Sequence, residues 1–197
     1  MAKRSPSERP GSPRARLFLA LELPDETRSA LVEWRSGALD GRSDLRPVAP
    51  EALHVTLIFL GYQYEKEIER IAATAFDAVR ALAPPFLEPA EVVPVPRARD
   101  PRLFALDLVD PAGDCAALQL ATSDALAAGR FYKPEKRPFW PHVTLARVKR
   151  DVRRAPPVGG DPPALDPFTA PLVTLYRSVL RREGARYEPL EQLTLGQ

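Results

Sequence analysis

The two histidines of this 197-residue chain open the same tetrapeptide, His-Val-Thr-Leu, once at His54 and once at His142. Both copies lie in apolar, β-branched runs that predict β-strands. Side chains alternate between the faces of a strand, so each histidine shares a face with the threonine two positions on, Thr56 or Thr144. Histidine titrates near neutral pH, so one imidazole can remove a proton while the other supplies one. We therefore expect a cleft for acid–base phosphoryl chemistry, in which the threonine hydroxyls donate to negatively charged oxygens.

Other kinds of site fit these residues less well. A lone histidine on a strand is more often structural, but this chain has both of its histidines in one repeated pattern. Zinc sites usually have three or four ligands, and threonine is a poor one. The chain has neither a Gly-x-Ser-x-Gly elbow nor a glycine-rich phosphate loop. The pattern favours two-histidine chemistry without a metal or another cofactor.

Three residues near the second motif are candidate substrate contacts. Arg147 is a candidate phosphate clamp, because a guanidinium group bonds two oxygens at once. Strict strand alternation would turn Arg147 away from His142, so a twist, a bulge or a strand end is needed to bring it inward; otherwise it is a solvated arginine. Phe139 and Trp140 directly precede the motif and are candidate base-stacking residues. Packing in the core is an equally good interpretation of both.

Composition and charge bound the class of protein. The chain is 45% hydrophobic and 27% charged, which is typical of a globular protein, and its net charge of +2 argues against a general nucleic-acid coat. Lys133, Lys136 and Arg137 form a local basic cluster that would guide an RNA backbone or simply be solvated. The lone Cys115 excludes an intrachain disulfide and a cysteine metal site, and it is expected in the core. With neither a secretory signal nor an apolar span, we expect a cytoplasmic protein.

The chain also repeats itself on a larger scale. The run from Arg16 to Leu23 resembles the run from Arg102 to Leu108, and 86 residues separate Arg16 from Arg102. A separation of 88 residues relates the two histidines, so the two matches share nearly one offset. This coincidence indicates two related halves, roughly 16–98 and 99–195, within one domain over 16–195. Residues 1–15 read as a disordered basic tail.

Hydrophobic periodicity predicts the elements of each half as strand, helix and histidine strand. The mixture of short strands, helices and antiparallel returns predicts an α+β protein with two sheet lobes. The expected elements are strands at 16–23, 102–109, 172–180 and 187–195, helices from about Asp25, over 64–83 and from about Asp114, an extended segment over 86–95 that bridges the two halves, and a long loop over 151–167.

The stretches Leu53 to Gly61 and Phe139 to Arg147 resemble the paired His-x-Thr-x motifs of the 2H phosphoesterase superfamily. Within it, the chain is most similar to the RNA 2′,3′-cyclic phosphodiesterase family, also called the LigT-like or 2′-5′ RNA ligase family. The resemblance extends over residues 16–195. It implies a bilobal 2H phosphoesterase fold, with two antiparallel-type sheets and outer helices related by a pseudo-two-fold axis, and an active-site cleft between them.

The resemblance also implies an activity. It implies metal-independent hydrolysis of an RNA-terminal 2′,3′-cyclic phosphate to a 2′-phosphate, with His54 as proton donor and His142 as proton acceptor. The two motifs are locally identical, so the residues alone do not separate these roles. The expected partners are RNA with such an end, or cyclic nucleotides, bound by a monomer without metal or membrane. Two alternatives stay open: reversible 2′-5′ RNA ligation, and an RNA- or nucleotide-binding module without turnover.

Overall fold

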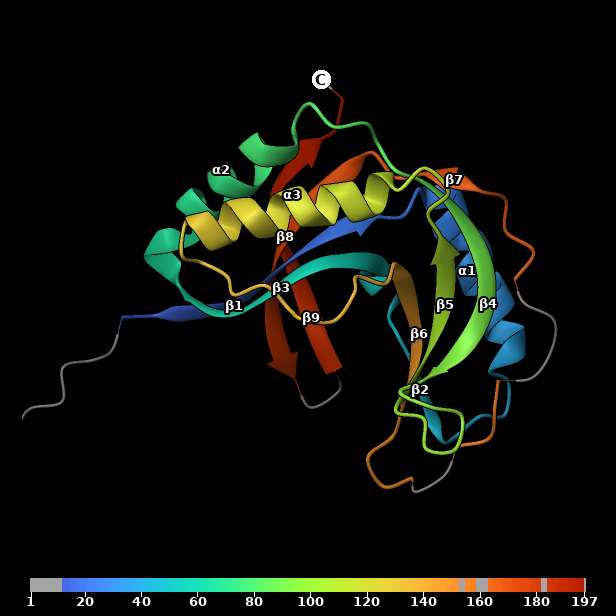
Figure 1. Cartoon of the computed structure of the whole chain (residues 1–197). Helices are drawn as coiled ribbons and strands as arrows, with labels where there is room; N and C mark the ends of the chain where they lie inside the picture. The colour runs from blue at the N-terminus through green and yellow to red at the C-terminus, as the bar shows by residue number, and fades with distance from the viewer. Residues whose placement is uncertain (1–11, 153–154, 159–162, 182–183, 197) are drawn as a thin grey trace, which may run out of the picture.

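The structure is a computed structural model that describes residues 12–152, 155–158, 163–181 and 184–196 (Figure 1). The predicted tail lies mostly outside these residues, and the first strand begins at Arg14. No helix in the described ranges is long and apolar enough to cross a membrane. The elements are β1 (Arg14–Glu22), α1 (Asp25–Ala38), β2 (Leu45–Pro47), β3 (His54–Tyr64), α2 (Ile68–Val79), β4 (Phe86–Val95), β5 (Leu103–Val109), α3 (Asp114–Ala128), β6 (His142–Val148), β7 (Phe168–Thr169), β8 (Leu172–Arg181) and β9 (Gly184–Thr194), with short 3-10 turns at Pro50–Ala52 and Glu65–Glu67.

The strands form a curled antiparallel sheet in the order β7-β4-β5-β6-β3-β1-β8-β9, with β2 added beside β6. The order divides into two groups of four, β3-β1-β8-β9 and β6-β5-β4-β7, which meet where β3 pairs with β6 (Figure 1). The predicted α+β class is confirmed. The strand order assigns β4 to the second group and β8 and β9 to the first, so each group takes strands from both halves of the sequence.

Most predicted elements form close to their expected places, but one helix is shorter and two short strands were not predicted. The helix predicted over 64–83 is limited to Ile68–Val79, because β3 continues to Tyr64, where it still pairs with Arg14 of β1. Strand pairing satisfies the backbone groups of these residues, so tertiary context overrides their helical spacing. The short strands β2 and β7 were not predicted; β2 forms by pairing Leu45–Pro47 with β6, and β7 by pairing Phe168–Thr169 with β4.

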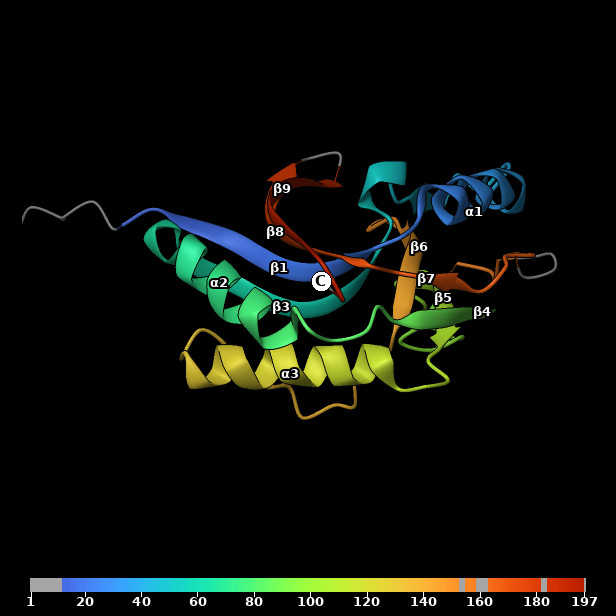
Figure 2. The same ribbon diagram turned by 90° about the horizontal axis from the view of Figure 1, so that it is seen from above.

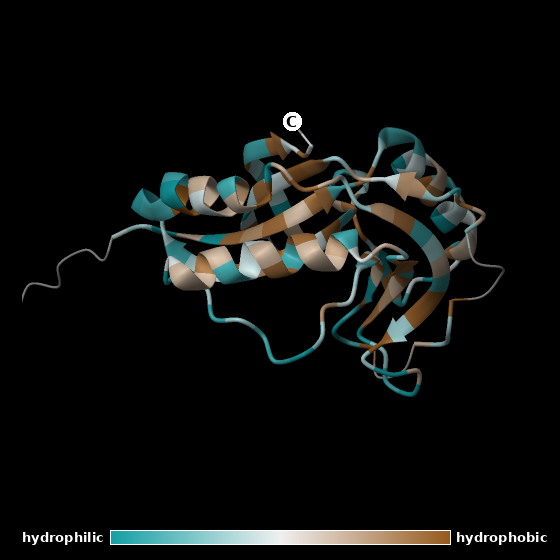
Figure 3. Ribbon diagram, turned by 45° about the horizontal axis from the view of Figure 1, so that its top comes forward, coloured by the Kyte–Doolittle hydropathy of each residue, from teal (hydrophilic) through white to brown (hydrophobic). Residues whose placement is uncertain are grey.

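The two faces of the sheet have different environments. Helices α2 and α3 lie side by side against one face, below β1 and β3 in Figure 2, while α1 lies at the other end of the molecule. Buried apolar side chains of the central strands and these helices fill that side, among them Leu19, Val55, Ile71 and Leu118. The central strands are strongly hydrophobic along most of their length, and the long connection after α3 is largely hydrophilic (Figure 3). The other face is left open by the curl of β8 and β9.

Candidate active site

The two histidine motifs meet at the junction of the sheet. Val55 of β3 and Val143 of β6 are antiparallel partners, and both side chains are buried in the core. Antiparallel register about this pair places His54 next to Thr144, and Thr56 next to His142. All four side chains point to the face opposite the two valines and are partly exposed. The structure therefore brings the two predicted motifs into one site.

A cleft of about 690 Å³ opens on this face. Its lining includes His54, Thr56, Thr144 and Arg147, whereas His142 lies beside Thr56 on the same face and is not among the lining residues. The positive charge of Arg147 acts on the titration of both histidines. The cationic side chains around it come from several elements; they are Arg16, Arg46, Arg147, Lys149 and Arg150. Such a lining suits an anionic ligand.

A bulge in β6 turns Arg147 towards the cleft. Thr144 pairs with Ala105, yet Ala146 pairs with Phe104, so Leu145 is an extra residue in the ladder. The adjacent residues Leu145 and Ala146 are both buried, and Arg147 is exposed. One added residue reverses the alternation, and Arg147 therefore shares the face of Thr144. This is one of the local irregularities that the sequence pattern required for a phosphate clamp.

β3 contains the same irregularity after the first motif. Thr56 pairs with Ala20 and Ile58 pairs with Leu19, which leaves Leu57 as the extra residue. Phe59 consequently faces the cleft, five positions after its histidine, as Arg147 does in β6. Its ring is 42% exposed, and the guanidinium carbon of Arg16 lies 4.5 Å from the ring centroid. This pair offers a flat surface on which a nucleobase can stack.

His54 lies among aromatic rings. Its ring centroid is 5.0 Å from that of Phe18 and 5.4 Å from that of Tyr187, and its Nε2 lies 3.0 Å from Thr56 Oγ1. Burial lowers the pKa of His54 to about 4, with smaller contributions from the charges of His142 and Arg147, while a hydrogen bond with the backbone of Ala52 opposes the shift. His54 is thus neutral at pH 7 in the free protein.

His142 is held mainly by Trp140. Nδ1 of His142 lies 2.8 Å from the carbonyl oxygen of Trp140, so this nitrogen donates and Nε2 carries the lone pair of the neutral ring. The indole and imidazole rings are stacked, with centroids 4.1 Å apart and planes at 14°. Burial lowers the pKa of His142, and the nearby charge of Asp107 opposes that shift.

The predicted base-stacking residues lie beside the site rather than in the cleft lining. Phe139 packs against the hydrophobic core, and one face of Trp140 lies on His142. Base stacking by either stays a prediction. Lys136 and Arg137 of the basic cluster are exposed, and Arg137 pairs with Glu135 at 3.3 Å.

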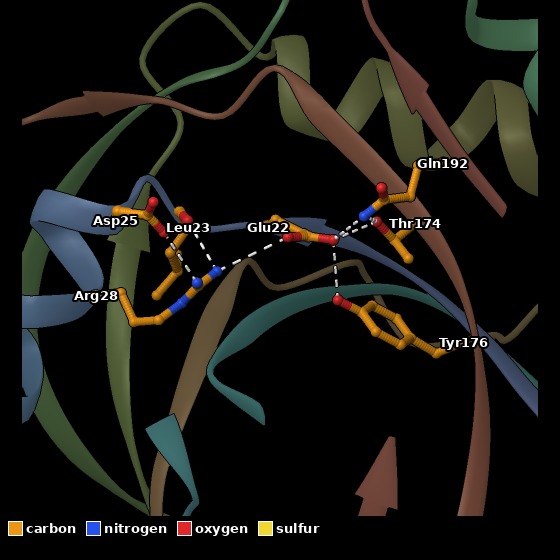
Figure 4. A network of polar contacts seen from close by, with 7 residues as sticks. All are labelled: Glu22, Leu23, Asp25, Arg28, Thr174, Tyr176 and Gln192. Atoms are coloured by element: carbon orange, nitrogen blue, oxygen red, sulfur yellow. Dashed lines mark hydrogen bonds and ion pairs between the residues drawn. The ribbon is translucent and has the colours of Figure 1, made fainter. Parts of the chain in front are cut away.

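Several site residues were not found from the sequence. Glu22 is the most connected of them: its Oε1 accepts hydrogen bonds from the hydroxyl groups of Thr174 and Tyr176 and from Gln192 Nε2, and Arg28 lies 3.8 Å from its Oε2 (Figure 4). Phe18, Phe59, Tyr187 and Asp107 were also missed. The repeat contained one signal, because Glu22 and Asp107 occupy similar places in the two matched runs.

Two further observations concern metal and cysteine chemistry. Among the described residues, no three histidine, cysteine or acidic side chains are grouped as a metal site would need. Cys115 is buried in α3, as predicted, and burial raises the pKa of its thiol to about 12. Its thiol is therefore protonated at neutral pH and packs as a small apolar group.

Known proteins are similar to most of this chain. A family model described as the 2′-5′ RNA ligase superfamily matches residues 23–158. The RNA 2′,3′-cyclic phosphodiesterase of Escherichia coli is 31% identical to this chain, and the match covers 92% of this chain and 97% of the E. coli protein. The RNA 2′,3′-cyclic phosphodiesterase of Thermus thermophilus is 34% identical, and the match covers 91% of this chain and 90% of the Thermus protein. The crystal structure of E. coli LigT complexed with 3′-AMP superposes with a TM-score of 0.74 at 28% identity, covering 94% of this chain and all of that one.

Proposed function

This chain belongs to the 2′-5′ RNA ligase superfamily, and we propose that it hydrolyses the 2′,3′-cyclic phosphate at the end of an RNA to a 2′-phosphate. The observation that carries the proposal is the pairing of β3 with β6 at Val55 and Val143, which sets two imidazoles and two hydroxyls on one open face. Relatives that align with almost the whole chain are named for this activity, and a related structure holds 3′-AMP.

The proposed reaction needs one acid and one base. His142 accepts a proton from water as the water oxygen attacks phosphorus. The bond from phosphorus to the 3′-oxygen breaks, and His54 gives a proton to that oxygen, which leaves a 3′-hydroxyl and a 2′-phosphate. Thr56, Thr144 and Arg147 bind the non-bridging oxygens, where negative charge increases in the transition state.

The assignment of His54 as acid requires that substrate binding protonates it. In the free protein the low pKa of His54 keeps this imidazole neutral. A bound phosphodiester brings a negative charge beside Thr56 and Thr144, and a nearby anion raises the pKa of an imidazole. The hydrogen bond from Nδ1 of His142 to the Trp140 carbonyl leaves the Nε2 lone pair free to accept a proton.

The substrates, the compartment and the oligomeric state are part of the proposal. RNA ends or cyclic nucleotides are the substrates, and a cytoplasmic monomer acts on them without a bound metal. The cationic lining of the cleft, which includes Arg46, Lys149 and Arg150, supports an RNA substrate that extends from its cyclic end.

The test is an assay on an oligoribonucleotide that ends in a 2′,3′-cyclic phosphate, with a chelator present throughout. We expect a 2′-phosphate product, and little product from His54→Ala or His142→Ala. A 3′-phosphate product would contradict the proposed bond cleavage, and loss of activity in the chelator would contradict metal independence. A second reaction with a 5′-hydroxyl RNA added reports 2′-5′ joining; a joined product in excess over hydrolysis would make ligation the main activity.

A further inference from the structure

Each histidine has an acidic residue opposite it on the neighbouring strand. Glu22 of β1 is the antiparallel partner of His54 in β3, and Asp107 of β5 is the partner of His142 in β6. Antiparallel partners project to the same face, so each carboxylate shares the face of its imidazole. β1 and β5 occupy equivalent places in the two strand groups, each next to a histidine strand. The two halves therefore repeat a carboxylate as well as a histidine and a threonine.

Asp107 holds the ring on which His142 rests. Its Oδ1 accepts a hydrogen bond of 2.6 Å from Nε1 of Trp140. Trp140 in turn contacts His142 twice, through the stacked rings and through the carbonyl that receives the Nδ1 hydrogen. A tryptophan anchored at its N–H has little freedom to rotate, so Asp107 fixes the plane in which the imidazole lies.

Glu22 does the same for the aromatic group around His54. Its carboxylate accepts a hydrogen bond of 3.0 Å from the hydroxyl of Tyr176 (Figure 4). The ring of Tyr176 stacks on Phe18 with centroids 5.1 Å apart, and Phe18 contacts His54. The centroid of Tyr176 itself lies 6.2 Å from that of His54. Arg28, Thr174 and Gln192 fill the remaining positions around the carboxylate.

We propose that Glu22 and Asp107 are a matched pair of positioning residues, each using an aromatic hydrogen-bond donor to hold the histidine on the adjacent strand. The inference rests on the proposed function, since it gives both histidines a reaction to be positioned for. It also gives Tyr176 and Trp140 equivalent roles. Each donates a hydrogen bond to one carboxylate, and each belongs to the group of aromatic rings that packs around one imidazole.

The charges around each histidine predict separate effects. Around His54, burial lowers the pKa most, and the charges of His142 and Arg147 lower it further. The backbone hydrogen bond with Ala52 and the charge of Glu22 raise it, and the rings of Tyr176 and Tyr187 also face the imidazole.

Around His142, burial lowers the pKa most and the charge of Arg147 lowers it further, whereas the hydrogen bond to the Trp140 carbonyl and the charge of Asp107 raise it. Removing the charge of Glu22 or Asp107 should therefore lower the pKa of its own partner and have a smaller effect on the other histidine.

The experiment uses the two histidines as internal probes. A chain with two imidazoles gives two Cε1–H signals, which His54→Ala and His142→Ala assign, and whose positions are followed against pH by NMR. Asp107→Asn keeps an oxygen for the Trp140 N–H but removes the charge, and Glu22→Gln does the same for Tyr176. Asp107→Ala removes both. Asp77→Asn, an exposed carboxylate on α2, is the matched control.

We expect Asp107→Asn to lower the titration midpoint of His142 and Glu22→Gln to lower that of His54, while Asp77→Asn changes neither. Asp107→Ala should also move the His142 signal, because Trp140 loses its hydrogen bond and the ring-current effect of its indole on His142 changes. We expect kcat to fall about tenfold with KM nearly unchanged. Thermal unfolding of each variant verifies that the measurements are made on folded protein.

The inference is overturned if both midpoints and kcat are unchanged in these variants. It is also overturned if Asp107→Ala raises KM alone, which would make Asp107 a substrate contact. A wild-type protein inactive on cyclic phosphates, but with the expected NMR changes, would contradict the proposed function and support the positioning pair. A wild-type protein that is active on cyclic phosphates, with unchanged titration midpoints and unchanged kcat in the variants, would support the proposed function and contradict the positioning pair.

Discussion

Val55 of β3 and Val143 of β6 are the antiparallel partners through which the two groups of strands join. Each valine lies between a histidine and a threonine in sequence, so one backbone pairing aligns all four polar side chains. The valines themselves are anchored in the core behind the site. The proposed catalytic groups are thus fixed by two paired strands rather than by loops, which is the arrangement expected to hold geometry most rigidly.

The two histidine roles can be separated with a sulfur leaving group. A substrate with sulfur in place of the 3′-oxygen needs little help from an acid, because a thiolate leaves far more readily than an alkoxide. On the ordinary substrate, His54→Ala and His142→Ala should each reduce kcat by about 100-fold or more. On the sulfur substrate, we expect His54→Ala to recover most of its activity and His142→Ala to stay impaired. Recovery by His142→Ala instead would reverse the roles.

The threonines should act on the transition state. Thr56→Val and Thr144→Val preserve shape and remove only the hydroxyl, so each should lower kcat by about 100-fold with a smaller change in KM. Thr169→Val, in β7 away from the cleft, is the control for a strand threonine. An unchanged kcat in both variants would show that the hydroxyls do not stabilise the reacting phosphate.

Arg147 should contribute through the shape of its guanidinium group. Arg147→Lys keeps the charge but loses the planar fork, and we expect KM to increase about tenfold, as the loss of one charged hydrogen bond implies. Steady-state kinetics at two salt concentrations distinguish this loss from a general charge effect, which would leave the lysine variant nearly normal. Arg137→Lys, outside the cleft lining, should have wild-type kinetics.

Because burial lowers the pKa of His54, we expect the free energy of unfolding to depend on pH. Its pKa is about 4 in the folded protein and near 6.5 when unfolded, so between these values the unfolded chain binds more protons. The free energy of unfolding should therefore decrease as pH falls from about 6.5 to about 4, by about 3 kcal/mol from this group. Urea denaturation at pH 7.5 and 4.5 measures the change, and His54→Gln removes this contribution. An equal pH dependence in wild type and His54→Gln would contradict it.

Two phenylalanines allow the base-binding surface to be located. Phe59→Ala removes an exposed ring from the cleft and should raise KM for an RNA end by an amount equivalent to about 1–3 kcal/mol, but not for a cyclic ribose phosphate without a base. Phe139→Ala, in a ring packed against the core, should instead lower the unfolding temperature and leave KM unchanged. A higher KM for an RNA end in Phe139→Ala, with an unchanged KM in Phe59→Ala, would instead identify Phe139 as the base-stacking residue.

Local patterns were sufficient where the backbone follows its simplest geometry. The helices beginning at Asp25 and Asp114 form where their periodicity and end signals indicated, and the segment expected to be extended over 86–95 forms β4. The helix expected over 64–83 is shorter because its first residues extend a strand that β1 stabilises. β2 was missed because three residues carry too little periodicity to indicate a strand.

The sequence by itself determined the chemistry of this protein: both histidines, their threonines and the two-fold repeat are local patterns, and strand alternation alone puts each histidine and threonine on one face. Only the tertiary structure decided which residues surround them. Glu22 reaches His54 through strand pairing, and Tyr176 and Tyr187 arrive from β8 and β9, more than 100 positions along the chain. The bulges at Leu57 and Leu145, which turn Phe59 and Arg147 inward, arise from the register of neighbouring strands. The register of a strand pair depends on which backbone groups of the two strands hydrogen-bond to each other. It is therefore set by both segments together, and the pattern of one segment does not specify it.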